Sequence, residues 1–153
     1  YIYLLKLKLK DMKLELKNLA PYLPYDLKCD IFFAQQSMGT CVWRIRTLDC
    51  FYLDKLKNNL EFIQPILLPL SDLTKEIEVN GEKFLPIDIL SGETYFDYEL
   101  TKSNKLVEKD EKNIVILECI DVYPYWIVQK LLQWHFDIFG LIDKGLAIDI
   151  NTL

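Results

Sequence analysis

The sequence predicts an α+β fold in which a small, mostly antiparallel sheet packs against a long, largely buried C-terminal helix. Half of the 153 residues are hydrophobic (51%), and a chain of this length buries enough surface to fold without a disulfide or a metal. Residues 40–47 alternate as a half-buried strand does, and residues 114–123 are rich in β-branched side chains. From residue 124 onward, apolar side chains recur on adjacent faces of one helix.

The N-terminal half of the chain supplies most of the predicted sheet. Residues 12–19 suit either a short strand or a helical turn, and residues 55–63 suit either a short helix or a strand. Pro21 and Pro24 favour an extended backbone between them. The predicted strands in this half are residues 27–34 and 40–47, with 50–53 as a hairpin partner.

The middle of the chain is expected to be less regular. Ser71 or Asp72 can cap the start of a short helix, because its side-chain oxygen accepts from a free backbone N–H. Asn80 and Gly81 predict a tight turn, since both residues tolerate a positive φ. Residues 91–113 are expected to be the least ordered region, and the mixed-charge run over residues 108–112 predicts a solvated loop before the interior strand over residues 114–123.

The C-terminal helix is expected to begin after Pro124, a residue that is tolerated in a first turn. Lys144 suits its last turn, and Gly145 suits the position that follows the helix. Residues 146–150 alternate and predict a final strand. In this arrangement His135, the only histidine, packs inside the fold.

Charge and composition exclude several classes of function. The formal charge of −5 opposes general binding to nucleic acids or to anionic membranes, although not a local basic patch. No apolar run reaches the roughly 18–20 residues that span a bilayer. The four cysteines lie outside any paired motif, mostly beside apolar neighbours, so we expect reduced, buried thiols and a cytoplasmic protein.

The candidate site residues are few, and each has a structural alternative. Arg44 and Arg46 are the only arginines and share one predicted strand face, where, with Lys28 and an aromatic side chain, they could bind nucleic acid. Cross-strand pairing with Asp or Glu is the alternative that we favour. His135 could serve a small hydrolase, but Asp137 lies on another side of the predicted helix. We therefore predict no catalytic residue, metal or cofactor.

An acidic cluster in the middle of the chain has a plain explanation. Asp72 and Glu76 would lie one turn apart in a helix, with Glu78 close by and Lys75 between them. Acidic side chains at the start of a helix interact favourably with its dipole. We therefore read this group as local electrostatics.

Three segments carry a resemblance. They are residues 19–25 (LAPYLPY), residues 69–77 (PLSDLTKEI) with 80–84 (NGEKF), and residues 133–153, which are the most specific. Together they resemble small uncharacterised proteins encoded in prophages and mobile elements of gut Bacteroidetes; residues 26–63 match least. The resemblance implies a mobile-element setting inside a bacterial cell and a natural start near Met12, but no activity.

These observations lead to one functional expectation and one alternative. We expect residues 1–11 to be a non-native or disordered extension and residues 12–153 to form a single domain. The protein would be a non-enzymatic accessory protein of a phage or mobile element that acts through contact with a protein partner, in an oligomeric state that the sequence leaves open. The alternative is a nucleic-acid-associated protein that uses Arg44 and Arg46.

Overall fold

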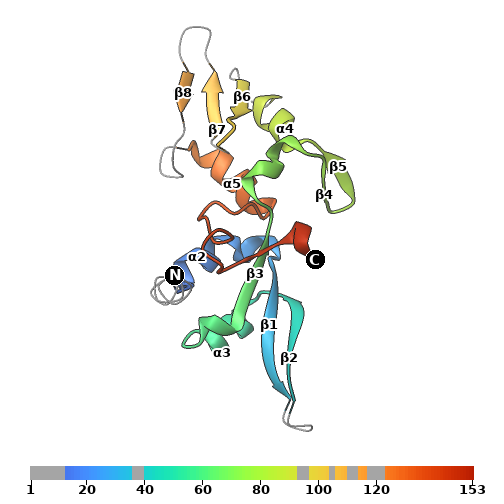
Figure 1. Ribbon diagram of the computed structural model, residues 1–153, viewed down its shortest axis with the longest axis vertical. Helices are drawn as coiled ribbons and strands as arrows, with labels where there is room; N and C mark the ends of the chain where they lie inside the picture. Colours follow the sequence, from blue (N-terminus) through green and yellow to red (C-terminus); the bar gives the residue numbers. More distant parts are fainter. Residues whose placement is uncertain (1–12, 36–39, 93–96, 104–105, 110–113, 117–122) are drawn as a thin grey trace, which may run out of the picture. The chain divides into compact units, whose positions relative to one another are not determined.

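A computed structural model describes residues 13–35, 40–92, 97–103, 106–109, 114–116 and 123–153. The chain divides into two compact units, each of which contains both helices and strands (Figure 1). Unit 1 comprises Tyr1–Leu67 and Phe139–Leu153, and unit 2 comprises Leu68–Ile138. The predicted extension over residues 1–11 lies outside the described residues, and the single domain over residues 12–153 stays a prediction.

Unit 1 is built on a four-stranded mixed sheet with the strand order β2-β1-β3-β9. Strand β1 pairs antiparallel with β2 and β3, whereas β3 pairs parallel with β9. The strands are β1 (Lys28–Gln35), β2 (Thr40–Thr47), β3 (Ile63–Leu67) and β9 (Ile148–Asp149). The predicted strands over residues 27–34 and 40–47 are confirmed, and the predicted final strand is present as the two residues of β9.

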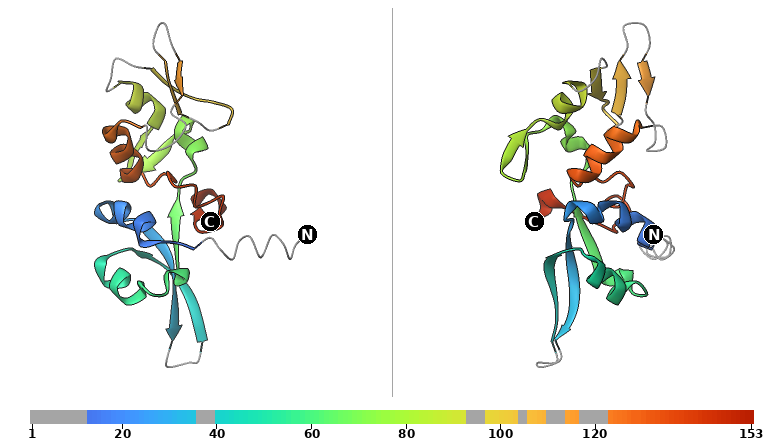
Figure 2. Two further views of the ribbon diagram at one scale, coloured as in Figure 1. Left: turned by 90° about the vertical axis from the view of Figure 1, so that its left-hand side faces the viewer. Right: turned by 180° about the vertical axis from the view of Figure 1, so that it is seen from behind.

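Short helices complete unit 1, and α2 and α3 lie on the same side of its sheet (Figure 2). The predicted strand over residues 50–53 is wrong, because the Asp49 side chain accepts from the Tyr52 N–H at 2.9 Å and so caps a helix instead. The extended segment predicted around Pro21 and Pro24 is also wrong, since both residues lie in a 3-10 helix. The helical elements are α2 (Leu16–Leu19), η1 (Ala20–Tyr25), α3 (Cys50–Leu56), η2 (Leu60–Phe62) and η5 (Ile150–Thr152).

Unit 2 contains a two-stranded and a three-stranded sheet with two α-helices. Asn80 and Gly81 have φ angles of 54° and 85° and join β4 to β5, so the predicted turn is confirmed. The region over residues 91–113, which the sequence predicts to be the least ordered, contains the paired strands β6 and β7, and residues 93–96, 104–105 and 110–113 lie outside the described part. The elements are η3 (Leu70–Thr74), β4 (Ile77–Val79), β5 (Glu82–Phe84), α4 (Pro86–Gly92), β6 (Asp97–Leu100), β7 (Leu106–Lys109), β8 (Ile114–Ile116) and α5 (Tyr125–Gln133).

Two predicted features of unit 2 need further correction. The predicted interior strand over residues 114–123 is described only as β8, which lies at the end of the order β6-β7-β8; residues 117–122 lie outside the described part. Neither Ser71 nor Asp72 caps the short helix. Pro69 occupies that position in η3, with no side-chain hydrogen bond, and Asp72 lies within the turn.

The long C-terminal helix is the main error of the sequence prediction, because α5 has only nine residues and ends at Gln133. The N–H of His135 donates to the carbonyl of Leu132 at 3.0 Å, and the N–H of Phe136 donates to that of Leu131 at 2.8 Å. These two bonds form a Schellman motif, which closes a helix with a left-handed residue. His135 is that residue, with a φ of 61°.

The chain then leaves the helix in an extended conformation. The N–H of Leu68 donates to the His135 carbonyl at 2.9 Å, and the N–H of Asp137 donates to the Leu68 carbonyl at 2.8 Å. Leu131 and Phe136 are fully buried in the core of unit 2, so the apolar contact that usually accompanies a Schellman motif is available. Burial of Phe136 therefore favours the end of the helix, which the apolar periodicity alone did not indicate.

Candidate functional site

Strand β2 forms one edge of the unit 1 sheet, since it pairs with β1 and with no other described strand. An edge strand presents a row of backbone N–H and C=O groups that can pair with another chain. Natural proteins usually protect such edges with prolines, bulges, very short strands or charged side chains. Strand β2 has eight residues, contains no proline and pairs with β1 in an unbroken register.

The hydrogen bonds identify which backbone groups of β2 face outward. The Leu48 N–H donates to the Leu27 carbonyl at 2.8 Å, directly beyond the end of the β1–β2 ladder. Hydrogen-bonded pairs recur at every second residue of an antiparallel ladder, so the backbones of Arg44 and Arg46 bond to β1. The outward backbone groups belong to the alternate residues, namely Cys41, Trp43, Ile45 and Thr47.

Apolar side chains are exposed along one face of this edge. Trp43 is 41% exposed and Ile45 is 49% exposed. The Trp43 ring lies 5.3 Å from the ring of Phe32, which in turn lies 5.2 Å from the ring of Phe62. We call Trp43, Phe32 and Phe62 the aromatic row. Only Trp43 in this row is exposed, because Phe32 and Phe62 are half-buried behind it. Trp43 and Ile45 together form the exposed apolar surface at this edge, and contiguous surface of this kind can mark a contact site.

Both arginines are exposed on the opposite face of β2, where Arg44 lies across from Ile31 and Arg46 from Cys29. The favoured prediction was an ion pair with a neighbouring strand. No carboxylate of the described residues lies within ion-pair distance of either guanidinium. The Arg46 guanidinium instead donates to the carbonyl of Ile45 at 3.2 Å and covers one of the outward acceptors.

Lys28, the third predicted nucleic-acid contact, lies on the other face of the sheet. It is opposite Thr47 and donates a hydrogen bond to the Thr47 hydroxyl. The structure therefore brings Arg44 and Arg46 together and places Lys28 on the side of Trp43. Strands β1 and β2 carry three cations and one carboxylate, Asp30, which makes this hairpin locally basic in a chain with a net charge of −5.

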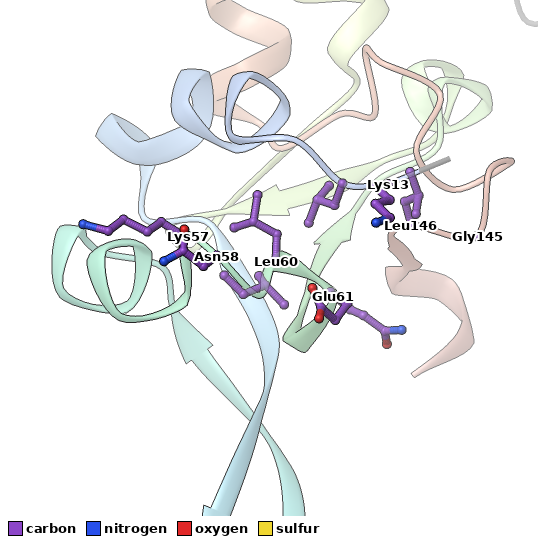
Figure 3. A pocket seen from close by; sticks show the side chains of 10 residues that line it. Lys13, Lys57, Asn58, Leu60, Glu61, Gly145 and Leu146 are labelled. Carbon is purple, nitrogen blue, oxygen red and sulfur yellow. The ribbon is translucent and has the colours of Figure 1, made fainter. Parts of the chain in front are cut away.

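Unit 1 also contains an open depression of about 550 Å³. Figure 3 shows Lys57 and Asn58, just beyond α3, at one side of it and Gly145 and Leu146 at the other. Lys57 binds Asp54 at 2.8 Å in an exposed ion pair. That pairing raises the pKa of Lys57 and lowers the pKa of Asp54 through a hydrogen bond and charge attraction. The polar side chains that line the depression are exposed or half-buried, whereas a catalytic site usually holds buried, convergent polar groups; they are Lys13, Lys57, Asn58, Glu61 and Gln64.

The other candidate residues have structural roles. Asp72 is buried and its carboxylate binds the Lys75 ammonium at 2.5 Å. Glu76 lies beyond the end of η3 at Thr74, so the two carboxylates are not one helical turn apart as predicted. Within the described part of the chain, no three Asp, Glu, His or Cys residues gather as a metal site would require. The backbone of His135 closes α5, and its side chain is half-buried.

The described thiols differ from each other. Cys29 is buried, and burial raises its pKa from 9.0 to about 12, so this thiol is a poor nucleophile at neutral pH. Cys50 is free and exposed, which makes the prediction of burial wrong for this residue. The side chains of Cys41 and Cys119 lie outside the described part.

None of the helices in the described ranges has the length and hydropathy that crossing a bilayer requires. Comparisons with family models, curated proteins and solved structures found no match to this chain. The resemblance to small Bacteroidetes mobile-element proteins therefore stays a prediction. The outward edge of β2 combines the exposed side chains of Trp43 and Ile45 with two exposed arginines, and it is the candidate site among the described residues.

Proposed function

We propose that this chain is a non-enzymatic accessory protein of a phage or mobile element that acts through contact with a protein partner at the β2 edge. The observation that carries the proposal is the exposure of Trp43 and Ile45 beside an outward row of backbone groups. Tryptophan is among the residues most enriched at hot spots, the few interface residues that contribute most of the binding energy. The mobile-element setting is supported by the sequence resemblance.

Site-specific photo-crosslinking in a Bacteroidetes host tests this proposal. A photoreactive amino acid at Ile45 should join the chain to one protein, whereas the same group at Lys83, an exposed strand residue of unit 2, should not. The adduct would be identified by mass spectrometry, and the partner purified. Binding of the purified partner would then be measured by calorimetry.

The purified pair allows a quantitative test of the aromatic row. Trp43→Ala should weaken binding by about 30-fold, the effect expected of a tryptophan at the centre of an interface. Tyr125→Ala removes an aromatic ring that is 75% exposed in unit 2 and should leave the affinity unchanged. Equal affinity of the Trp43→Ala variant and the wild type would refute the proposal.

A second candidate function is association with nucleic acid through Arg44 and Arg46. Its support is that both guanidinium groups are exposed and lack a carboxylate partner among the described residues. If each arginine contacts a phosphate, the double Arg44→Gln/Arg46→Gln variant should reduce the slope of log affinity against log salt by about 2. Absence of binding to single-stranded and duplex DNA or RNA at low salt would exclude this function.

A further inference from the structure

We infer that the outer edge of β2 receives an extended segment of the partner protein as an additional strand, and that this segment alternates acidic with apolar side chains. The inference rests on the proposed function and specifies how the partner binds. Strand addition to a free sheet edge is a recurrent mode of peptide recognition, in which backbone bonds supply affinity and alternate side chains supply specificity.

The backbone of β2 is suited to accept such a strand. Trp43, Ile45 and Thr47 direct their N–H and C=O groups away from β1, as the ladder pattern requires. The strand is regular over eight residues and has no bulge in its pairing with β1. A partner segment of similar length could therefore pair along it in register. Within the described residues, the contact that an incoming strand would replace is the hydrogen bond from the Arg46 guanidinium to the Ile45 carbonyl.

The side chains of β2 determine what the partner must present. Side chains directly opposite each other on neighbouring strands contact on the same face. On one face the partner meets Trp43 and Ile45, which calls for apolar side chains two residues apart. On the other face it meets Arg44 and Arg46, which calls for carboxylates at the intervening positions. The segment therefore reads as acidic and apolar residues in alternation.

A second copy of β2 is a poor occupant of this edge. Antiparallel pairing that places Trp43 against Ile45 also places Arg44 against Arg44 of the other copy. Pairing that places Ile45 against itself puts Arg44 against Arg46. Like charges directly opposite each other destabilise a sheet. Pairing that places Trp43 against itself sets Arg44 opposite Val42 and Arg46 opposite Thr40, which avoids like charges but supplies no carboxylate, because β2 contains none. An acidic partner segment therefore complements both arginines, whereas a second copy of β2 does not.

A synthetic probe tests the inference directly. The probe is a dye-labelled, end-blocked nine-residue peptide of alternating Val and Glu, and its control replaces every Glu with Lys. Fluorescence anisotropy should show binding of the acidic probe and none of the basic control at the same concentrations. Arg44→Gln and Arg46→Gln should each weaken binding by up to about fivefold. Added salt should weaken it as well, because the charges are exposed.

Proline substitution separates backbone pairing from side-chain contact. Ile45→Pro removes an outward N–H but leaves the bonds to β1, and proline is tolerated on edge strands at such positions. It should weaken binding at least about tenfold, since the outward N–H is lost and the ring obstructs the incoming strand. Ile45→Val keeps both the N–H and the β-branched shape and should bind within about twofold of the wild type.

Amide hydrogen exchange provides a measurement that needs no substitution. In the free protein the amides of Arg44 and Arg46 should exchange slowly, and those of Trp43, Ile45 and Thr47 quickly. The acidic probe, or the crosslinked partner, should slow the three outward amides. Binding without this alternating protection, unchanged affinity of Ile45→Pro, or failure of the acidic probe to bind would each overturn the inference.

The same experiments distinguish a failure of strand addition from a failure of the proposed function. If Trp43→Ala abolishes partner binding while Ile45→Pro does not, the partner uses the aromatic row without adding a strand. The proposed function then stands and the inference fails. If neither variant affects partner binding, both fail. Displacement of the acidic probe by single-stranded DNA or RNA would assign the arginines to nucleic acid and overturn the inference.

Discussion

Two substitutions of His135 distinguish the observed end of α5 from the long helix that the sequence predicts. The test is which of the two variants has the larger free energy of unfolding. With a φ of 61°, this residue lies in the left-handed region at the end of α5. A residue with a Cβ atom pays roughly 1–2 kcal/mol for that conformation, and glycine does not. His135→Gly should therefore be more stable than His135→Ala by about 1 kcal/mol, although both variants lose the imidazole.

The long helix predicted from the sequence requires the opposite result. In a helix interior, glycine is less stable than alanine by about 1 kcal/mol. The free energies of unfolding of the two variants would be compared by urea titration, with tryptophan fluorescence as the probe. A Trp43→Phe background is used because Trp126 and Trp134 then report on unit 2 alone. Thermal midpoints should differ by about 2–4 °C. Equal stability, or a more stable alanine variant, would refute the left-handed assignment.

Three further predictions follow from burial and backbone conformation. Above pH 9 the unfolded Cys29 thiol loses its proton, whereas the folded thiol retains it up to a pH of about 12. The free energy of unfolding should therefore fall by about 1.4 kcal/mol per pH unit over that range, relative to Cys29→Ala. Urea titrations under reducing conditions would measure this difference. Phe136→Ala should cost about 3–5 kcal/mol and Phe51→Ala less than about 1 kcal/mol, because Phe136 is fully buried and Phe51 is 57% exposed. Gly81→Ala should cost about 1 kcal/mol in urea unfolding, since φ is 85° although the space around the residue is open.

Local signals in the sequence predicted the features that depend on a few neighbouring residues. The alternation over residues 40–47 and the Asn80-Gly81 pair specify a strand and a turn without tertiary contacts. The helix at α3 was missed, although Asp49 three residues before Tyr52 is a cap signal. Apolar periodicity outweighed that signal because Phe51 and Leu53 also suit a strand.

The end of α5 depended on tertiary structure and could not be predicted from periodicity. Both a continued helix and the observed bend bury apolar side chains after Gln133. The bend is favoured because Phe136 reaches the core of unit 2 and because Leu68, more than 60 residues earlier in the chain, pairs with the backbone at His135. Because a histidine occupies the left-handed position, where glycine is usual, the sequence does not mark the end of this helix.

The candidate site was predictable in its residues but not in its arrangement. Alternation in the sequence places Arg44 and Arg46 on one strand face, as the structure shows. Strand order decides whether a strand lies at the edge or in the centre of a sheet, and no local pattern encodes it. Ile45 was therefore overlooked, since its importance comes from an outward-facing backbone and an exposed side chain.

The two arginines also predict that this long, regular edge resists pairing with a second copy of the chain. Strand β2 has no proline or bulge and is not short, so its charged side chains are what can protect this edge from pairing with another chain. Replacing both with threonine, a strand-forming neutral residue, removes the repulsion and the cover over the Ile45 carbonyl. The Arg44→Thr/Arg46→Thr variant should therefore associate at lower concentrations than the wild type in sedimentation velocity, whereas Lys55→Thr in α3 should not. Identical sedimentation of the double variant and the wild type would show that charge does not guard this edge, and would remove the reason for expecting an acidic strand in place of a second copy.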